Sequence, residues 1–164
     1  MIIFGIDPGS RVTGFGLVQI FDNQILHVSH GVIKMEPELD FNQRLFELSE
    51  SLEQLLVKYQ PDIVVIEKIF LGKNADSAFK LGHVRGVAIQ KAVAHRCVVK
   101  EYASRLIKKA ITGSGQAEKQ QVLVVIQKIL GLNLIQHLDA SDALALAVYQ
   151  ASQQQRPSQQ GIVL

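Results

Sequence analysis

Four carboxylates stand at the ends of the most apolar segments of this chain. Asp7 and Glu67 each close an apolar run, and Asp139 and Asp142 lie three residues apart at the head of a third. A carboxylate at the tip of a buried strand is costly to desolvate unless it is paired or binds a cation. Two strand tips and a pair of acids on one helix face can meet at one site for a divalent metal.

The chemistry that such a cluster would support is metal-assisted cleavage of a phosphate ester. Crowded carboxylates raise one another's pKa values and repel unless a cation lies among them. Mg²⁺ prefers oxygen ligands and keeps positions open for water and phosphate. Two such ions about 3.5–4 Å apart can activate a water and stabilise the leaving oxygen. The five histidines lack zinc spacing, and the sequence singles out no catalytic triad and no Walker-type phosphate loop.

Each acid also has a purely structural interpretation. Asp7 precedes Pro8 and Gly9 and could shape a turn, while Glu67 could be a strand-end charge that faces water. Asp139 could cap a helix, with Asp142 favoured in the first turn by the helix dipole. Taken singly, these structural roles are the simpler explanation. Taken together, four acids at the ends of apolar segments favour a shared site.

Composition predicts a single globular domain with an uneven charge distribution. The 164 residues are 48% apolar and 20% charged, which is typical of one packed core. Residues 68–109 carry 10 Lys/Arg against 2 Asp/Glu, whereas residues 1–67 carry 4 against 10. A basic middle indicates a polyanionic partner, although a solvated helix face explains it equally well. The single cysteine, Cys97, favours a reducing, cytoplasmic environment, and we expect neither a leader peptide nor a membrane span.

Apolar periodicity predicts an α/β fold with a mixed sheet. The predicted strands span residues 2–7, 12–20, 24–35, 62–67 and 98–102. The predicted helices run from 41 to the proline at 61, and then over about 74–95, 103–112, 117–130 and 139–152. Short links make the first three strands an antiparallel meander, and the helix after them makes the fourth strand parallel to a neighbour. Active sites of such sheets lie beyond the carboxyl ends of strands, where Asp7 and Glu67 both stand.

The ends of the domain and one helix carry further expectations. Residues 1–151 should form the single domain, and the Gln-rich tail 152–164, without apolar periodicity, should be disordered. In the long middle helix, Ala78, Gly82 and Gly86 recur every four residues. Glycine within a helix costs about 0.5–1 kcal/mol relative to alanine, so close packing should offset it. That packing could be against the protein's own sheet or against the same helix of a second subunit.

Several motifs, taken in order, resemble those of the RuvC family of Holliday junction resolvases. These motifs are Gly5-Ile6-Asp7-Pro8-Gly9-Ser10-Arg11-Val12-Thr13-Gly14, Ile66-Glu67 with Phe70, Lys73-Asn74-Ala75-Asp76-Ser77-Ala78, Leu81-Gly82, Arg85-Gly86-Val87-Ala88, Glu101-Tyr102-Ala103, Ala117-Glu118-Lys119 and Asp139-Ala140-Ser141-Asp142-Ala143-Leu144-Ala145. They cover about residues 2–150. The resemblance implies a ribonuclease-H-like fold, in which a mixed five-stranded sheet is flanked by helices.

The resemblance also implies an activity and its participants. A homodimer would resolve four-way DNA junctions in recombination and repair by paired, Mg²⁺-dependent nicking, with about two ions per subunit and Mn²⁺ able to substitute. RuvA and RuvB, the branch-migration proteins, are the implied partners. The matching residues take their roles from the family. The catalytic and metal-binding acids are Asp7, Glu67, Asp139 and Asp142; Lys108 and Lys119 lie near the scissile phosphate; Phe70, Lys73 and Arg85, with the same two lysines, contact DNA.

The chain departs from the family pattern in places, and rival functions can be weighed. Lys68 follows the catalytic Glu67, where a cation could compete with Mg²⁺ or help to hold phosphate. Actin-like and Hsp70-like ATPases share an Asp-x-Gly turn between strands, but they need a longer chain with two such lobes. A protein that binds branched DNA without catalysis would not need all four acids. The YqgF-like nucleases share the fold but lack the motifs at 73–78 and 85–88.

Overall fold

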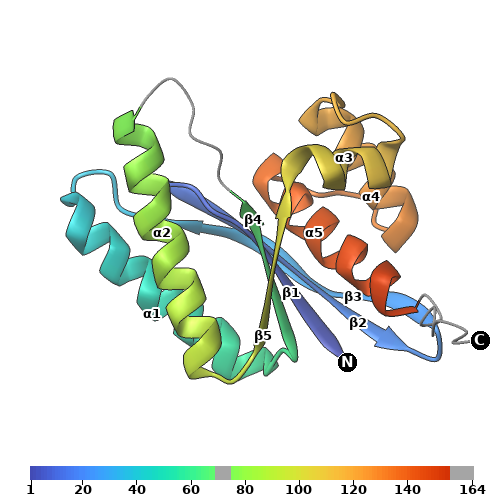
Figure 1. Ribbon diagram of the computed structural model, residues 1–164, viewed down its shortest axis with the longest axis horizontal. Coiled ribbons are helices and arrows are strands. Elements are labelled where there is room, and N and C mark those ends of the chain that lie inside the picture. Colours follow the sequence, from blue (N-terminus) through green and yellow to red (C-terminus); the bar gives the residue numbers. More distant parts are fainter. Residues whose placement is uncertain (69–74, 156–164) are drawn as a thin grey trace, which may run out of the picture.

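A mixed five-stranded sheet with helices on both faces forms the molecule, and the computed structural model describes residues 1–68 and 75–155 (Figure 1). The strands are β1 (Ile2–Asp7), β2 (Val12–Phe21), β3 (Gln24–Lys34), β4 (Ile63–Lys68) and β5 (Val98–Ala103). The helices are α1 (Phe41–Tyr59), α2 (Ala75–Ala94), α3 (Ser104–Thr112), α4 (Lys119–Leu130) and α5 (Leu138–Gln155). The predicted α/β fold, a mixed five-stranded sheet flanked by helices, is confirmed.

The order of strands in the sheet is β3-β2-β1-β4-β5. The first three strands pair antiparallel, and β4 lies parallel to both β1 and β5. Asp22 and Asn23 join β2 to β3 and both have positive φ, which is the backbone geometry of a tight hairpin turn. Because β1, β4 and β5 run in the same direction, their carboxyl ends lie side by side. This end of the strands is called the carboxyl edge of the sheet below.

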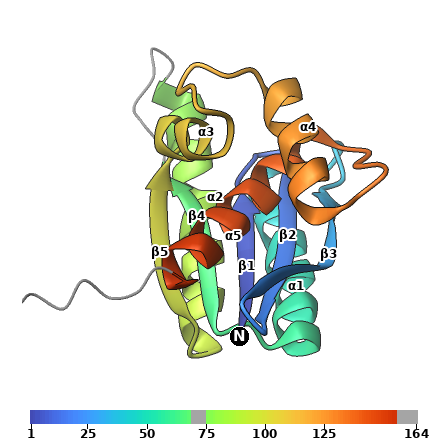
Figure 2. The ribbon, with the colours of Figure 1, turned by 90° about the vertical axis from the view of Figure 1, so that its right-hand side faces the viewer.

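Two apolar cores form, one on each face of the sheet. Helices α1 and α2 cover one face, where Leu48, Leu52 and Leu56 of α1 are buried against the strands. Helix α5 lies across the other face, with α3 and α4 packed around it (Figure 2). A capping box between Asp40 and Gln43 fixes the start of α1. None of the helices within residues 1–68 and 75–155 combines the length and apolar character needed to span a bilayer.

The C-terminal helix runs further than the sequence predicts. Helix α5 continues through Gln155, so residues 152–155, expected to begin a disordered tail, are helical. Two contacts explain the extension: Ser152 Oγ donates to the Tyr149 carbonyl at 2.7 Å, and Gln155 Nε2 donates to the Asn23 carbonyl at 2.8 Å. The helix end is thereby tied to the β2–β3 turn. The rest of the predicted tail, 156–164, lies outside the described residues.

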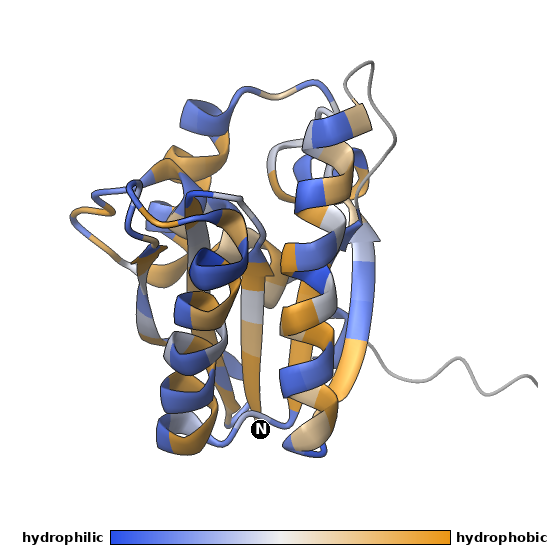
Figure 3. Cartoon of the chain, turned by 90° about the vertical axis from the view of Figure 1, so that its left-hand side faces the viewer, coloured by the Kyte–Doolittle hydropathy of each residue, from blue (hydrophilic) through white to orange (hydrophobic). Residues whose placement is uncertain are grey.

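The small residues of α2 do not pack against the protein's own sheet, so that interpretation is wrong. A Cβ added to Gly82 or Gly86 would meet nothing within 4 Å. Both glycines instead line an open groove between α1 and α2, beside Leu45, Phe79 and Val87. Figure 3 views this side of the molecule and shows apolar residues among the polar ones on both helices. The alternative of a second subunit against this stripe stays a prediction.

Candidate active site

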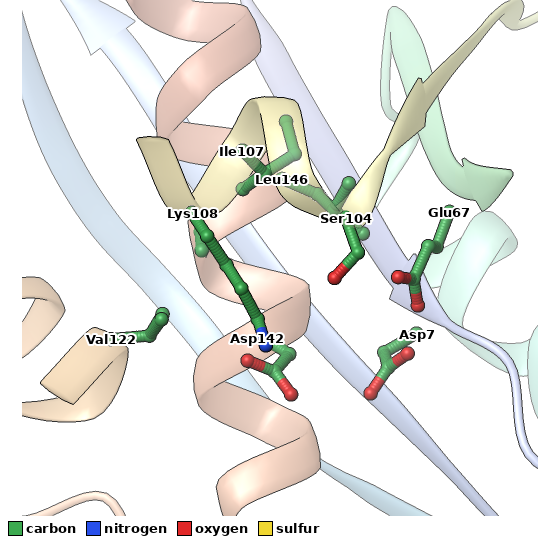
Figure 4. A pocket seen from close by; sticks show the side chains of 9 residues that line it. Asp7, Glu67, Ser104, Ile107, Lys108, Val122, Asp142 and Leu146 are labelled. Carbon is green, nitrogen blue, oxygen red and sulfur yellow. The ribbon is translucent and has the colours of Figure 1, made fainter. Parts of the chain in front are cut away.

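Three elements bring the predicted acids together at the carboxyl edge of the sheet. Asp7 ends β1, Glu67 is the penultimate residue of β4, and Asp139 and Asp142 lie in the first turns of α5. One carboxylate oxygen from each of Asp7, Asp139 and Asp142 lies within 4.8 Å of the others. Figure 4 shows Asp7, Glu67 and Asp142 around a shared pocket. The structural role of Asp139 as a helix cap is wrong, because α5 already begins at Leu138.

Glycines let α5 approach the sheet closely enough to deliver its two acids. A Cβ on Gly14 would lie 2.1 Å from the Asp139 carbonyl oxygen, and one on Gly5 would lie 2.0 Å from the Ala143 carbonyl oxygen. No side chain fits in such a space, because real Cβ atoms do not approach other heavy atoms this closely. The backbone of α5 therefore rests directly on β1 and β2, which sets its acids beside Asp7.

The turn after Asp7 is fixed by a buried hydroxyl. The Thr13 side chain is fully buried, and its Oγ1 donates to the Gly9 carbonyl at 3.1 Å and accepts from the Gly9 N–H at 3.3 Å. A Cβ on Gly9 would lie 2.0 Å from the Val12 carbonyl oxygen, so glycine is needed in this turn. The motif around Asp7 thus holds the end of β1 in a fixed geometry.

Lys119 lies among the acids. From the first position of α4, its Nζ lies 2.7 Å from Asp142 Oδ2, 2.9 Å from Asp139 Oδ1 and 3.7 Å from Asp7 Oδ2. A capping box between Glu118 and Gln121 begins α4 at this residue, two positions later than the sequence predicts. The cation in contact with the cluster is therefore Lys119, which the sequence predicts only near a substrate phosphate.

The surroundings of the site disfavour the ionised forms of Asp7 and Asp142. Burial raises the pKa of Asp7 well above its ordinary value; contact with Glu67 adds to the shift, and Lys119 opposes it. Burial likewise raises the pKa of Asp142, against the opposing effect of Lys119. Burial alone would lower the pKa of Lys119, but its hydrogen bonds to Asp142 and Asp139 outweigh burial and raise it. A cluster of oxygen donors with more negative than positive charge fits a hard divalent cation.

Two further polar residues line the pocket, and one was missed by sequence reasoning. Lys108 of α3 extends toward Asp142 (Figure 4), and its charge lowers the pKa of that acid. Ser104, the first residue of α3, also lines the pocket. Ser104 could have been predicted from the sequence, because it directly follows β5, a strand parallel to β4. Active-site residues of such sheets lie beyond the carboxyl ends of the strands, which was the argument used for Asp7 and Glu67.

The other predicted DNA contacts are not part of this pocket. Arg85 of α2 forms an ion pair with Glu101 of β5, and its side chain is 20% exposed. It joins α2 to the sheet edge, and its role toward DNA stays a prediction. Phe70 and Lys73 lie outside the described residues, so their predicted contacts with DNA stay predictions as well.

Comparison with known proteins assigns this arrangement to one family. The family model for the crossover junction endodeoxyribonuclease RuvC matches residues 3–150. RuvC from Bdellovibrio bacteriovorus is 50% identical over 151 residues, covering 92% of this chain and 90% of that protein. A structure of RuvC from Thermus thermophilus superposes with a TM-score of 0.82 at 27% identity, covering 92% of this chain and 93% of the other. The same protein in complex with a Holliday junction substrate gives a TM-score of 0.81 at 26% identity, with 92% of each chain covered.

Proposed function

The chain belongs to the RuvC family of crossover junction endodeoxyribonucleases, and from this premise we propose that it resolves four-way DNA junctions by metal-dependent cutting. The observation that carries the proposal is the convergence of carboxylates from β1, β4 and α5. Asp7, Asp139 and Asp142 lie close enough together to share a metal ion, and Glu67 lines one pocket with Asp7 and Asp142. Such a pocket has no use in a protein that only binds branched DNA. Two members of the cluster come from strands of one sheet and two from the helix packed on it, so the two-lobed architecture of the rival ATPases is not needed to explain it.

The metal that we propose is Mg²⁺, with about two ions per subunit and Mn²⁺ able to substitute. Asp7, Glu67, Asp139 and Asp142 would hold it, because they supply oxygen donors at the carboxyl edge of the sheet. When bound, the metal lowers the pKa of a water and neutralises charge on the phosphate. The raised pKa values of Asp7 and Asp142 support this assignment, because a divalent cation would stabilise the ionised form of both acids.

The protein's own cations would meet the phosphate at the mouth of the pocket. Lys108 of α3 lines the pocket, and Lys119 of α4 contacts the acids with a partly exposed side chain, so either ammonium can pair with a non-bridging oxygen. Water attacks phosphorus, the bond to the 3′ oxygen breaks, and that oxygen takes up a proton. The products are a 5′-phosphate and a 3′-hydroxyl. Ser104 lies where its hydroxyl could orient the water or a phosphate oxygen.

Junction binding would use a larger surface than the pocket. The basic residues of 68–109 would neutralise backbone phosphates, and Phe70, Lys73 and Arg85 are the contacts that we propose from the family pattern. Two subunits would pair through the groove that contains Gly82 and Gly86, because a two-fold protein presents equivalent sites to a two-fold junction. RuvA and RuvB are the proposed partners in the cytoplasm. The proposed nuclease domain is residues 1–151 together with the last turn of α5, which ends at Gln155.

A cleavage experiment with three DNA substrates tests the proposal. The protein is incubated with a synthetic four-way junction, a linear duplex of the same sequence and a fork, each with Mg²⁺ or EDTA. We expect paired nicks in the junction alone, and only with Mg²⁺. Asp142→Asn should remove cutting, whereas Asp22→Asn, which changes an exposed acid in the β2–β3 turn, should cut normally. Equal cutting of duplex and junction, or cutting in EDTA, would refute the proposal.

A further inference from the structure

The ammonium of Lys119 and a metal would draw on the same three carboxylates. The nitrogen lies 2.7 Å from Asp142 and 2.9 Å from Asp139, and 3.7 Å from Asp7. These three acids are also the residues whose carboxylate oxygens lie close enough together to hold a metal ion. An ammonium within 2.9 Å of two of these acids occupies the space between them where a metal ion would bind, and two cations this close together would repel each other strongly.

We propose that Lys119 is an internal placeholder for the metal: it neutralises the acids in the metal-free enzyme and must leave them when the metal binds. The inference rests on the proposed function, since it concerns the metal of that same site. It differs from the family's implied role for this lysine, in which the ammonium contacts the scissile phosphate. Here the lysine first regulates whether the metal can bind.

The position of Lys119 allows the exchange without any change in the fold. The residue is the first of α4, and 46% of its side chain is exposed, so rotation about its own side-chain bonds takes the ammonium out to solvent. Its backbone is fixed by the capping box of Glu118 and Gln121, which does not involve the lysine side chain. The aliphatic stem of lysine is long and flexible, and its ammonium is a compact charge that can pair with different anions.

The exchange would also connect metal loading to substrate binding. Once displaced, the ammonium would be free to pair with a phosphate of the DNA backbone that reaches the pocket lined by Lys108. An enzyme without metal would therefore keep its acids paired and one phosphate-binding cation occupied. Metal binding would free that cation, and the phosphate would in turn stabilise its new position. Metal and DNA would thus favour each other's binding through one side chain.

Metal titration without DNA tests the proposal separately from the cleavage activity. Free Mn²⁺ is followed by electron paramagnetic resonance as it is titrated into the wild type, Lys119→Gln, Lys119→Arg and Lys128→Gln. Lys128 is an exposed lysine of the same helix and controls for the loss of one positive charge. We expect Lys119→Gln to bind the first Mn²⁺ about tenfold more tightly. Lys119→Arg, which keeps the competing cation, and Lys128→Gln should stay within about twofold of the wild type.

A second measurement follows the lysine itself. The side-chain NMR signals of Lys119, assigned by comparison with Lys119→Gln, should move on addition of Mg²⁺ to the positions of a solvated lysine. Unchanged or weaker Mn²⁺ binding by Lys119→Gln would overturn the placeholder. Lys119 side-chain NMR signals that do not shift at saturating Mg²⁺ would also overturn the placeholder. If the wild type resolves junctions while either of these results is found, the proposed function stands and only the placeholder fails.

Discussion

Asp7 is the acid whose environment most opposes its charge. Its residue is 9% exposed, and the Glu67 carboxylate lies beside it. A carboxyl whose folded-state pKa is raised binds its proton more tightly in the folded protein than in the unfolded chain. Ionised Asp7 therefore lowers the stability of the metal-free protein at neutral pH. That loss disappears as the pH falls below the ordinary range for Asp, where the carboxyl is protonated in both states.

The first prediction follows from this sign. Asp7→Asn should raise the melting temperature of the metal-free protein in EDTA at pH 7 by a few degrees, since about 1 kcal/mol corresponds to roughly 2–4 °C in a domain of this size. The gain should shrink as the pH falls through the raised pKa of Asp7. Differential scanning calorimetry between pH 7 and the acid limit measures it. A variant that melts earlier than the wild type at pH 7 would show that Asp7 is stabilised by its neighbours.

Residue types and spacing were enough to predict that the four acids share a site. Each acid lies at the end or the start of an apolar segment, and such positions can be recognised in the sequence alone. The contact of Lys119 with three of these acids was not predictable. It depends on where α4 lies relative to α5, and the loop of residues 113–118 that sets this position carries no periodic signal. Ser104 was missed for a different reason: a serine at the start of a helix has an ordinary capping explanation.

At the scale of elements, the approach of α5 to the sheet decides whether a site exists. Gly5, Gly14 and Gly16 remove side chains where the helix backbone contacts β1 and β2. Small residues of α5 complete the contact, among them the fully buried Ala143 and Ala147. The helix that carries two acids can then lie near the strand that carries a third. Glycine lowers the intrinsic stability of these strands, and the close packing of α5 offsets that loss.

The second prediction tests this approach. Gly14→Ala should lower the free energy of unfolding by about 1–3 kcal/mol, because its Cβ would lie 2.1 Å from the Asp139 carbonyl oxygen and must push α5 away. Mn²⁺ affinity should fall with it, since Asp139 and Asp142 move with the helix. Denaturant unfolding and metal titration measure both effects. Gly86→Ala, whose Cβ would meet nothing within 4 Å, is the control and should leave metal affinity unchanged.

A partly buried hydrogen bond fixes the C-terminal half of α5. The Tyr102 hydroxyl donates to Gln150 Oε1 at 2.6 Å, and Gln150 is buried. Tyr102 pairs in register with Glu67, so this bond connects α5 to the part of the sheet that carries the fourth acid. The ring of Tyr102 also packs edge-on against Tyr149, with centroids 4.9 Å apart. The contact positions the helix against β5 as the glycines position it against β1 and β2.

The third prediction concerns this bond. Tyr102→Phe should cost about 1–3 kcal/mol of stability, because it leaves the Gln150 amide buried without its partner. The double variant Tyr102→Phe with Gln150→Met should recover much of the loss, since both polar groups are then gone. A double-mutant cycle in denaturant measures the coupling. Strictly additive losses would mean that the two side chains do not depend on each other.

Most elements of the fold were predictable because their apolar periods are long. The ends of the strands and helices agree with the sequence within two residues, except at the C-terminus, where the last helix ends three residues later than predicted. There the helix period of apolar residues stops near 151, but the chain stays helical through Gln155. A side-chain bond to the Asn23 carbonyl, 132 residues away in sequence, supports this last turn. Such a distant contact leaves no local pattern.

At the scale of the whole molecule, charge is divided between site and surroundings. The acids gather in one pocket, while residues 68–109 carry 10 basic residues against 2 acidic ones. Several of those basic residues belong to α3, which begins at the pocket with Ser104. A negative pocket next to a positive surface suits a backbone phosphate that is first attracted and then coordinated through metal.

The fourth prediction is a steep salt dependence of junction binding. The logarithm of the association constant should fall linearly with the logarithm of salt concentration, by about 0.9 for each phosphate neutralised. Arg105→Gln, on the exposed side of α3, should reduce that slope by about one. Lys58→Gln, on α1 within the acidic part of the chain, is the matched control and should leave the slope unchanged. Salt-independent binding by the wild type would contradict the electrostatic interpretation.

The fifth prediction concerns the pairing of subunits. Gly82 faces an open groove, and helix propensity favours leucine over glycine, so Gly82→Leu should leave the subunit folded. The added side chain would fill the groove into which the second copy of α2 is proposed to pack. We therefore expect a folded monomer that nicks one strand slowly. Sedimentation measures the monomer, and the ratio of linear to nicked product from a cruciform plasmid measures paired cutting.

The control for the dimer places the same side chain elsewhere on the helix. Ala94→Leu adds a leucine at the exposed end of α2, outside the residues that line the groove. It should remain dimeric and cut both strands. If both variants lose paired cutting, the loss is caused by adding an apolar side chain anywhere on the exposed surface of α2, and not by filling the groove. If the wild type sediments as a monomer on junction DNA, the two-fold arrangement itself is wrong, because one subunit then presents one set of acids to one strand.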